Sequence, residues 1–164
     1  KRIAHIGGYK RTRIFNNRVR GYIDALKKHN LPLDDELLTE SGLTIEDGRE
    51  KMLKLLSLDT PPDAVYVAGD YAALGALQVL KEKNIKIPED IALVGFGNEP
   101  FTDMVTPRIS SVHQHSAEIG KQAANTFLKY MGQDTIDQQL NKIILDSKLI
   151  VRNSSHKKNL PLNT

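Results

Sequence analysis

Residues 61–114 read PPDAVYVAGDYAALGALQVLKEKNIKIPEDIALVGFGNEPFTDMVTPRISSVHQ, and this stretch contains two strand-to-helix passages in a row. Ala64–Ala68 is a short apolar, β-branched run that ends where a helical pattern begins at Asp70, as a buried strand does when it leads into a helix. Ile91–Phe96 is a second apolar run, and small and polar residues follow it. Open parallel α/β sheets bind ligands beyond the carboxyl ends of their strands. We therefore expect the chemistry of this protein at Asp70 and at residues 97–99.

The amino-terminal part of the chain repeats the same alternation. Ile3–Ile6 reads as a strand that ends in two glycines, and the apolar residues within 12–30 recur on one helical face. Thr44, with Asp47 three residues later, predicts a capped helix start before residues 45–58. Three strand-helix repeats indicate an α/β fold with a parallel sheet and right-handed crossovers, which is one half of a two-lobed binding fold.

The pattern changes toward the carboxyl terminus. Ile109–Gln114 is predicted to be extended, and Ser116–Met131 is predicted to be a helix with one apolar face. A polar stretch at 132–141 separates this helix from a strand-like run at 143–151. The last helix therefore does not continue the strand-helix repeat.

Composition describes a soluble globular protein of about one domain, with 40% hydrophobic and 26% charged residues. No apolar run approaches the ~18 residues that span a bilayer, so we expect no membrane crossing. The chain has no cysteine, which excludes disulfides, thiolate metal sites and cysteine nucleophiles. Basic residues gather at 10–20 and at 156–158, but neither cluster has the interleaved aromatics or the recognition helix of a nucleic-acid surface. We do not expect these residues to contact DNA.

Five motifs in this chain match one family in register. Residues 62–77 read PDAVYVAGDYAALGAL and residues 87–96 read IPEDIALVGF. Residues 106–114, TPRISSVHQ, correspond to the family motif P-x-L-T-T-V-x-Q, residues 18–22 to its R-x-x-G-Y, and residues 149–154 to its L-V-x-R-x-S. With these motifs, nearly the whole chain resembles the lactose-repressor/galactose-repressor (LacI/GalR) transcription regulators.

The resemblance implies a fold and a division into parts. The fold is α/β, a three-layer αβα arrangement with a parallel sheet, similar to type I periplasmic binding proteins, and the chain forms mainly their C-terminal lobe. We expect residues 1–112 as that lobe, residues 113–142 as a crossover and a helix of the N-terminal lobe, and residues 143–154 as the return strand. Residues 155–164 are expected to be a disordered tail. Because the chain starts without a methionine or a signal sequence, we interpret it as a piece of a longer protein, and the missing signal assigns no location.

The resemblance also implies a function. It indicates a cytoplasmic sensory domain, without enzymatic activity or cofactor, that binds a small effector, a carbohydrate or sugar derivative. The two lobes shift when the effector binds, and a homodimer contacts operator DNA through an amino-terminal headpiece that these residues lack. A periplasmic sugar-binding protein of a transport system is the alternative with the same fold. A third class, an α/β enzyme, lacks any catalytic constellation in this sequence.

The family pattern places ligand-facing residues in the cleft. Arg18 matches the arginine that contacts the effector in the family, and its planar guanidinium suits hydroxyls, carboxylates or phosphates. Thr12 and Leu43 map to other cleft positions by spacing. Several relatives carry an aromatic residue at the position of Leu43, so this chain lacks that stacking platform.

The main departure from the family lies after the second apolar run. Many relatives read G-[FY]-D-[DN], with the aspartate on the effector, whereas this chain has glycine at Gly97. We expect Asn98 or Glu99 to supply the missing polar contact, or a larger effector to approach the bare backbone.

Asp70 has two compatible interpretations, a helix N-cap and a cleft side chain. A phospho-acceptor role is disfavoured, because the first strand ends in glycines rather than in the acidic residues that hold magnesium. His113 and His115 alternate on an extended segment, as metal ligands can, but no acidic residue or cysteine stands beside them, and no metal site is expected. His5, inside an apolar strand, is expected to be a hydrogen-bonded histidine of the core or the cleft edge.

Overall fold

The computed structural model describes residues 1–131 and 142–156. Within them, one sheet has the strand order β2-β1-β3-β4-β5-β6, in which the first five strands are parallel and β6 is antiparallel to β5. The strands are β1 (Ile3–Gly8), β2 (Leu38–Ser41), β3 (Ala64–Val67), β4 (Ala92–Gly97), β5 (Ser110–His113) and β6 (Lys148–Ile150). The helices are α1 (Arg13–Lys28), α2 (Ile45–Leu56), α3 (Asp70–Glu82) and α4 (Ser116–Tyr130), with short 3₁₀ helices η1 (Asp35–Leu37) and η2 (Pro100–Asp103).

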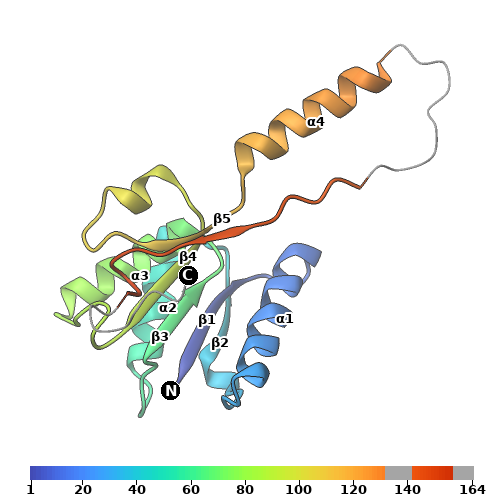
Figure 1. Ribbon diagram of the computed structural model, residues 1–164. Helices are drawn as coiled ribbons and strands as arrows, with labels where there is room; N and C mark the ends of the chain where they lie inside the picture. Colours follow the sequence, from blue (N-terminus) through green and yellow to red (C-terminus); the bar gives the residue numbers. More distant parts are fainter. Residues whose placement is uncertain (132–141, 157–164) are drawn as a thin grey trace.

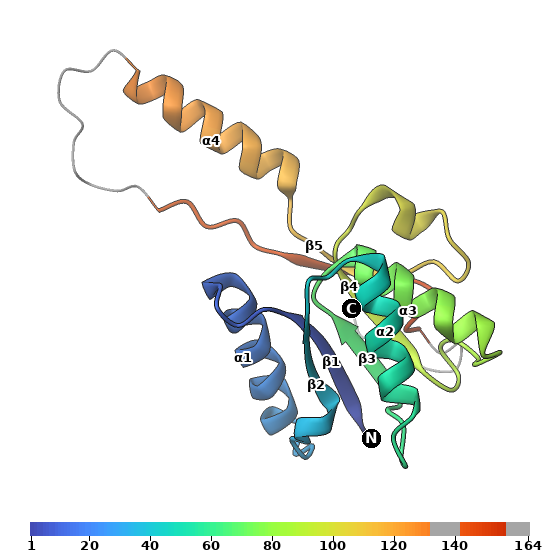
Figure 2. The same cartoon turned by 180° about the vertical axis from the view of Figure 1, so that it is seen from behind.

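Helices cover both faces of the sheet, which confirms the predicted three-layer αβα fold. α2 and α3 lie together on one face and α1 lies on the other, as Figure 1 and the reverse view in Figure 2 show. The core between the layers is built from strand and helix residues such as Ile6, Leu55, Leu80 and Leu93, all with no exposed surface. The apolar runs that predicted the strands therefore form the buried centre of the sheet.

The start of α2 confirms the predicted capping box. Thr44 Oγ1 accepts a hydrogen bond from the backbone N–H of Asp47, and the carboxylate of Asp47 accepts one from the N–H of Thr44. Each side chain satisfies a backbone group that the first turn of a helix leaves free. Local sequence alone determines this boundary.

α2 and α3 approach each other closely at two glycines. A Cβ atom on Gly48 would overlap the carbonyl group of Ala72, and one on Gly75 would overlap the carbonyl group of Ile45. Glycine inside a helix lowers its stability relative to alanine, so close backbone contact is the physical reason for these residues.

The second strand-to-helix passage ends differently from the first. After β4 the chain forms only the short η2, with Pro100 at its first turn, and then enters β5. The strand predicted within 143–151 is also shorter than its apolar run, because only Lys148–Ile150 pairs with β5. Beyond β6, buried Ser154 donates through Oγ to the carbonyl oxygen of Leu93 and accepts from the N–H of Ser110, which fastens the chain to β4 and β5.

α4 differs from the other α-helices because none of its residues is buried. It projects away from the sheet in both views and is joined to it by the chain after β5 and by the extended segment before β6 (Figure 1). The polar stretch at 132–141 and most of the expected tail, residues 157–164, lie outside the described residues. In the part of the chain that the structure describes, no helix combines the length and the apolar character needed to cross a membrane.

Candidate ligand-binding site

A pocket of about 220 Å³ lies at the carboxyl ends of the parallel strands. We call it the strand-end pocket. Its walls come from α1 and from the segments at which β2, β3, β4 and β5 end, which is the edge where open parallel α/β sheets bind ligands. The lining residues are Phe15, Arg18, Leu43, Ala68, Gly69, Asp70, Tyr71, Phe96, Gly97, Glu99 and Gln114.

Arg18 lies between two aromatic rings in this pocket. Its guanidinium carbon is 3.6 Å from the ring centre of Phe96 and 5.3 Å from that of Phe15, both within cation–π range. Nη1 donates to the carbonyl oxygen of Ala68 at the end of β3, and this is the guanidinium's one hydrogen bond within the described residues. Burial lowers the pKa of Arg18, and Tyr66 nearby partly offsets the effect. A fixed cation with N–H groups left over can bind a hydroxyl or an anionic group.

Asp70 is buried, with 2% of its surface exposed, and it joins three strand ends. Its interpretation as the N-cap of α3 is wrong, because Gly69 occupies that position and makes no side-chain cap. Instead, one carboxylate oxygen accepts from the Ser111 hydroxyl at 2.7 Å, and the other accepts from the backbone N–H of Glu99 at 2.8 Å. Both partners lie on other strands or their ends, so no local sequence rule could have identified them. Asp70 therefore shapes the pocket by fixing the loop after β4.

Two further predicted residues, Leu43 and Glu99, line the same pocket. Leu43 has a φ of 63°, a left-handed conformation that leucine rarely adopts, and its N–H donates to Ser41 Oγ. Glu99 is partly exposed, and its backbone N–H donates to Asp70. With Arg18 and Asp70, four of the six predicted ligand residues come together here.

The other two predicted residues, Thr12 and Asn98, are not among the lining residues of the strand-end pocket. Thr12 is exposed just before α1, and its hydroxyl donates to the carbonyl oxygen of Tyr9 rather than capping the helix. The Asn98 side chain accepts a hydrogen bond from Arg152 and lies beside His113. Direct ligand contact by Thr12 or Asn98 stays a prediction.

A family model described as a periplasmic binding protein-like domain matches residues 1–155 of this chain. The chain belongs to this family. The transcriptional repressor CytR of Escherichia coli is 32% identical over 155 residues, which cover 94% of this chain and 45% of CytR. The crystal structure of the transcription regulator CcpA of Lactococcus lactis has a TM-score of 0.86 at 29% identity and covers 95% of this chain and 56% of that one. A CelR–cellobiose complex has the same TM-score and identity, over 94% of this chain and 46% of that one.

These relatives confirm the resemblance to LacI/GalR regulators. The chain spans about half the length of the curated relatives it matches. It is a periplasmic binding protein-like domain whose relatives are transcription regulators.

The glycine that departs from the family pattern has a structural reason. Gly97 has a φ of 134°, a conformation that side chains strongly disfavour, and a Cβ there would lie 3.1 Å from a carboxylate oxygen of Asp70. An aspartate at this position would place a second carboxylate beside Asp70. The glycine thus leaves backbone, rather than a carboxylate, at this part of the wall.

Three aromatic residues and one amide of the pocket were missed in the sequence. Phe15 was assigned to the buried face of the first helix, and Phe96 to the interior of a strand, yet both contact Arg18. Tyr71 and Gln114 also line the pocket. Gln114 ends the motif TPRISSVHQ at a strand end, and that position was the signal that could have identified it.

His5 belongs to a stack of aromatic rings near Arg18. His5 is fully buried between the rings of Tyr22 and Tyr66, with centroid distances of 5.2 and 4.7 Å. Its Nδ1 donates to the carbonyl oxygen of Tyr66, whereas Nε2 has no partner within the described residues. Burial lowers the pKa of His5 to about 4. The hydrogen bond to Tyr66 opposes this shift, and the charge of Arg18 adds a smaller lowering. The prediction of a hydrogen-bonded core histidine is confirmed.

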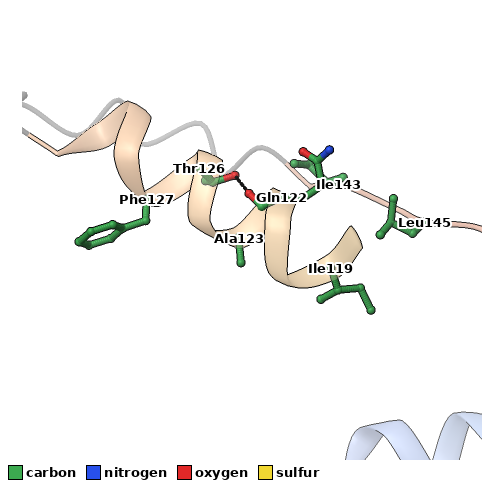
Figure 3. Close-up of a pocket in the computed structure, with 7 residues that line it drawn as sticks. All are labelled: Ile119, Gln122, Ala123, Thr126, Phe127, Ile143 and Leu145. Atoms are coloured by element: carbon green, nitrogen blue, oxygen red, sulfur yellow. Dashed lines mark hydrogen bonds between the residues drawn. The ribbon is translucent and has the colours of Figure 1, made fainter. Parts of the chain in front are cut away.

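A larger pocket, of about 670 Å³, lies along α4. We call it the α4 pocket. Figure 3 shows Ile119, Ala123 and Phe127 on the same side of the helix, with Ile143 and Leu145 of the extended segment nearby. Its walls come from one helix and one extended segment, and its polar groups bond within α4, as the Thr126 hydroxyl does to the carbonyl oxygen of Gln122. It offers no charged group to a ligand.

No group of three or more metal-ligating side chains is found within residues 1–131 and 142–156. The rings of His113 and His115 do lie close, with centroids 4.3 Å apart, but as a tilted pair beside Asn98. This arrangement does not gather the three or four ligands of a typical protein zinc site.

Proposed function

We propose that this chain is the effector-sensing domain of a LacI-type transcription regulator and that its effector binds in the strand-end pocket. The observation that carries the proposal is the position of Arg18, which lies between the rings of Phe15 and Phe96 in a pocket at the carboxyl ends of the strands that Glu99 also lines. A cation, a carboxylate and aromatic faces in one pocket are the usual parts of a small-molecule site.

The effector in this proposal is a carbohydrate or a sugar derivative. Arg18 supplies N–H donors, Glu99 supplies an acceptor, and the aromatic walls suit the apolar face of a sugar ring. Asp70 also lines the pocket, and each of its oxygens already accepts one hydrogen bond, from Glu99 or Ser111, so a ligand would share this carboxylate with the pocket's own network. The related CelR structure contains cellobiose, which supports a sugar class for this chain. Of the two residues expected to replace the missing aspartate, the pocket favours Glu99 over Asn98.

We also propose the division into lobes that the family pattern implies. Residues 1–112 form the C-terminal lobe, residues 113–142 cross to and contribute to the other lobe, and residues 143–154 return. The lack of any buried residue on α4 supports this division, since a helix with an apolar face normally packs against something. The effector would then change the arrangement of the lobes, because it binds one of two lobe arrangements more tightly than the other.

The rest of the proposal concerns the whole protein. An amino-terminal headpiece would contact operator DNA, two copies would form a homodimer, and the protein would act in the cytoplasm without enzymatic activity. We propose these properties from the resemblance to LacI/GalR regulators, and the matched relative CytR, about half of whose length this chain covers, is named as an HTH-type transcriptional repressor.

A ligand-shift melting screen of the full-length protein tests the proposal. Mono- and oligosaccharides, with nucleosides as a second series, are each added at increasing concentration. A ligand at about 100 times its Kd stabilises a protein by about 2.7 kcal/mol, so a true effector produces a shift that grows with concentration. We expect a response within the sugar series. A response to nucleosides alone would reject the sugar class, and no response in either series would contradict the sensing function.

A further inference from the structure

Asn98 occupies a special position at the rim of the strand-end pocket. It follows Gly97 and precedes Glu99, both of which line the pocket. Its φ is 58°, a left-handed conformation that asparagine tolerates better than most residues. The backbone N–H of Asn98 donates to Ser111 Oγ at 3.0 Å, and the same hydroxyl donates to Asp70. The backbone of Asn98 is therefore part of the network that holds the pocket.

The contacts of the Asn98 side chain fix the direction of its amide. Arg152 Nη2 donates to Oδ1 at 2.7 Å, and because a guanidinium has donors only, this atom must be the oxygen. Nδ2 then faces Nδ1 of His113 at 3.4 Å, at the long end of hydrogen-bond distances. Since the amide nitrogen is the donor, Nδ1 is the acceptor and the neutral ring carries its proton on Nε2.

These two contacts reach β5 and the residues just after β6, which together form the antiparallel strand pair that leads to α4 and returns from it. His113 is the last residue of β5, after which the chain passes through His115, in a left-handed conformation, into α4. Arg152 lies two residues after β6, on the other side of that strand from the extended segment that returns from α4. One amide side chain therefore contacts the last residue of β5 and a residue just beyond β6 at once.

Arg152 is itself held firmly. Nη1 donates to the carbonyl oxygen of Ile109 at 2.8 Å, Nε lies 3.1 Å from a carboxylate oxygen of Asp103, and 13% of the side chain is exposed. The backbone N–H of Arg152 donates to Ser110 Oγ at 2.7 Å. A guanidinium anchored on η2 and β5 gives Asn98 a fixed partner rather than a mobile one.

We propose that Asn98 is a positioning residue that ties the β5–β6 strand pair, which carries both connections of α4, to the rim of the strand-end pocket. Through Arg152 and His113 it sets the direction in which α4 leaves the sheet. Its use in regulation rests on the proposed function, because an effector that moves Gly97 or Glu99 would then move both connections together. The link itself is a property of the chain without ligand.

Spin-label distances test this link directly. The chain has no cysteine, so Asn17→Cys on α1 and Lys121→Cys on α4, both exposed, place two labels without background. The distance distribution is measured by pulsed electron paramagnetic resonance in this background and with Asn98→Gly, which removes the amide but accepts the left-handed backbone. We expect the distribution to broaden about twofold or more, because α4 then moves with less restraint.

Asn84→Gly is the matched control. Asn84 also has a φ of 58°, in the turn after α3, so the same substitution changes the same kind of backbone position far from the link. We expect this control to leave the distance distribution unchanged. An unchanged width in Asn98→Gly, even with a lowered melting temperature, would overturn the proposal and reduce Asn98 to a structural turn residue.

A double-mutant comparison separates the link from general loosening. Arg152→Lys should also broaden the distribution, and adding Asn98→Gly to it should broaden it by less than Asn98→Gly does alone, because the Arg152–Asn98 contact is already lost. Additive broadening would contradict the proposal. The experiment contains no ligand, so a failed effector screen would not affect its result. If the chain binds an effector but Asn98→Gly leaves the width of the distance distribution unchanged, only the proposed link is contradicted.

Discussion

The strand-end pocket, in which we propose that the effector binds, is smaller than the α4 pocket. The strand-end pocket has about 220 Å³ and walls from α1 and four strand ends, with Arg18 and Glu99 fixed by neighbours in the sheet. The α4 pocket has about 670 Å³ but lies on a helix without a single buried residue. A larger volume therefore does not identify the ligand site in this chain.

The walls of the two pockets differ in how many contacts with other parts of the chain hold them in place. Around the strand-end pocket, Asp70 connects residues 29 and 41 positions away in sequence. Beside α4, Phe127 and Ile144 leave 66% and 69% of their surface exposed. Apolar surface of this kind normally marks a place where another surface packs. The chain thus combines a sheet packed around a buried core with a helix, α4, whose apolar face is unpacked within the described residues.

The largest expected effect is at Asp70. Asp70→Ala leaves the N–H of Glu99 and the hydroxyl of Ser111 buried without an acceptor, and each orphaned donor costs about 1–3 kcal/mol. We expect urea unfolding to show a loss of about 3–5 kcal/mol in stability. The matched change at the other pocket, Thr126→Val, should stay within about 0.5 kcal/mol. Equal losses in both variants would remove the contrast between the two pockets.

The second prediction concerns pH and His5. The pKa of His5 is about 4 in the folded chain and 6.5 in the unfolded chain, so the unfolded chain binds more protons between these values. Stability is therefore full above pH 6.5 and falls as the pH drops toward 4, by up to about 3 kcal/mol. Chemical unfolding at several pH values measures this slope. It should largely disappear in His5→Phe, and an unchanged slope in that variant would assign the titration to another group.

Alanine substitutions at Gly75 in α3 and Gly120 in α4 compare how tightly the two helices are packed. Gly75→Ala brings a methyl group against the carbonyl of Ile45 and should cost about 1–3 kcal/mol. Gly120→Ala, in α4, meets nothing within 4 Å and should stabilise the helix by about 0.5–1 kcal/mol. Thermal unfolding with helix content followed separately checks both signs. A destabilising Gly120→Ala would mean that α4 is packed after all.

The smallest effect on stability is expected at Phe127. The exposed face of α4 should cause this chain to associate at micromolar to millimolar concentrations, and Phe127→Ser should reduce that association. Unfolding free energy should change by less than about 0.5 kcal/mol, because the ring is mostly exposed. Sedimentation at several concentrations is the measurement. A wild-type chain that remains monomeric throughout would show that the face needs no partner.

Local patterns were sufficient for the fold and for part of the site. The apolar runs predicted the sheet, and the capping box at Thr44 predicted the start of α2, because these features depend on neighbours in sequence. Arg18 and Leu43 followed from a family motif and its spacing. The role of Asp70 and the direction of the Asn98 amide depend on partners between 15 and 54 positions away, and no pattern in the sequence records such contacts.

The central claim is that the strand-end pocket binds the effector through Arg18, and calorimetry on the full-length protein tests it most directly. The best compound of the sugar series is titrated into the wild type, Arg18→Ala and Arg20→Ala, where Arg20 is an exposed arginine two residues further along α1. Loss of a charge-assisted hydrogen bond costs about 1.5–3 kcal/mol, so Arg18→Ala should weaken binding roughly ten- to a hundredfold. Arg20→Ala should keep the wild-type affinity within about twofold. Wild-type affinity in Arg18→Ala would contradict the claim.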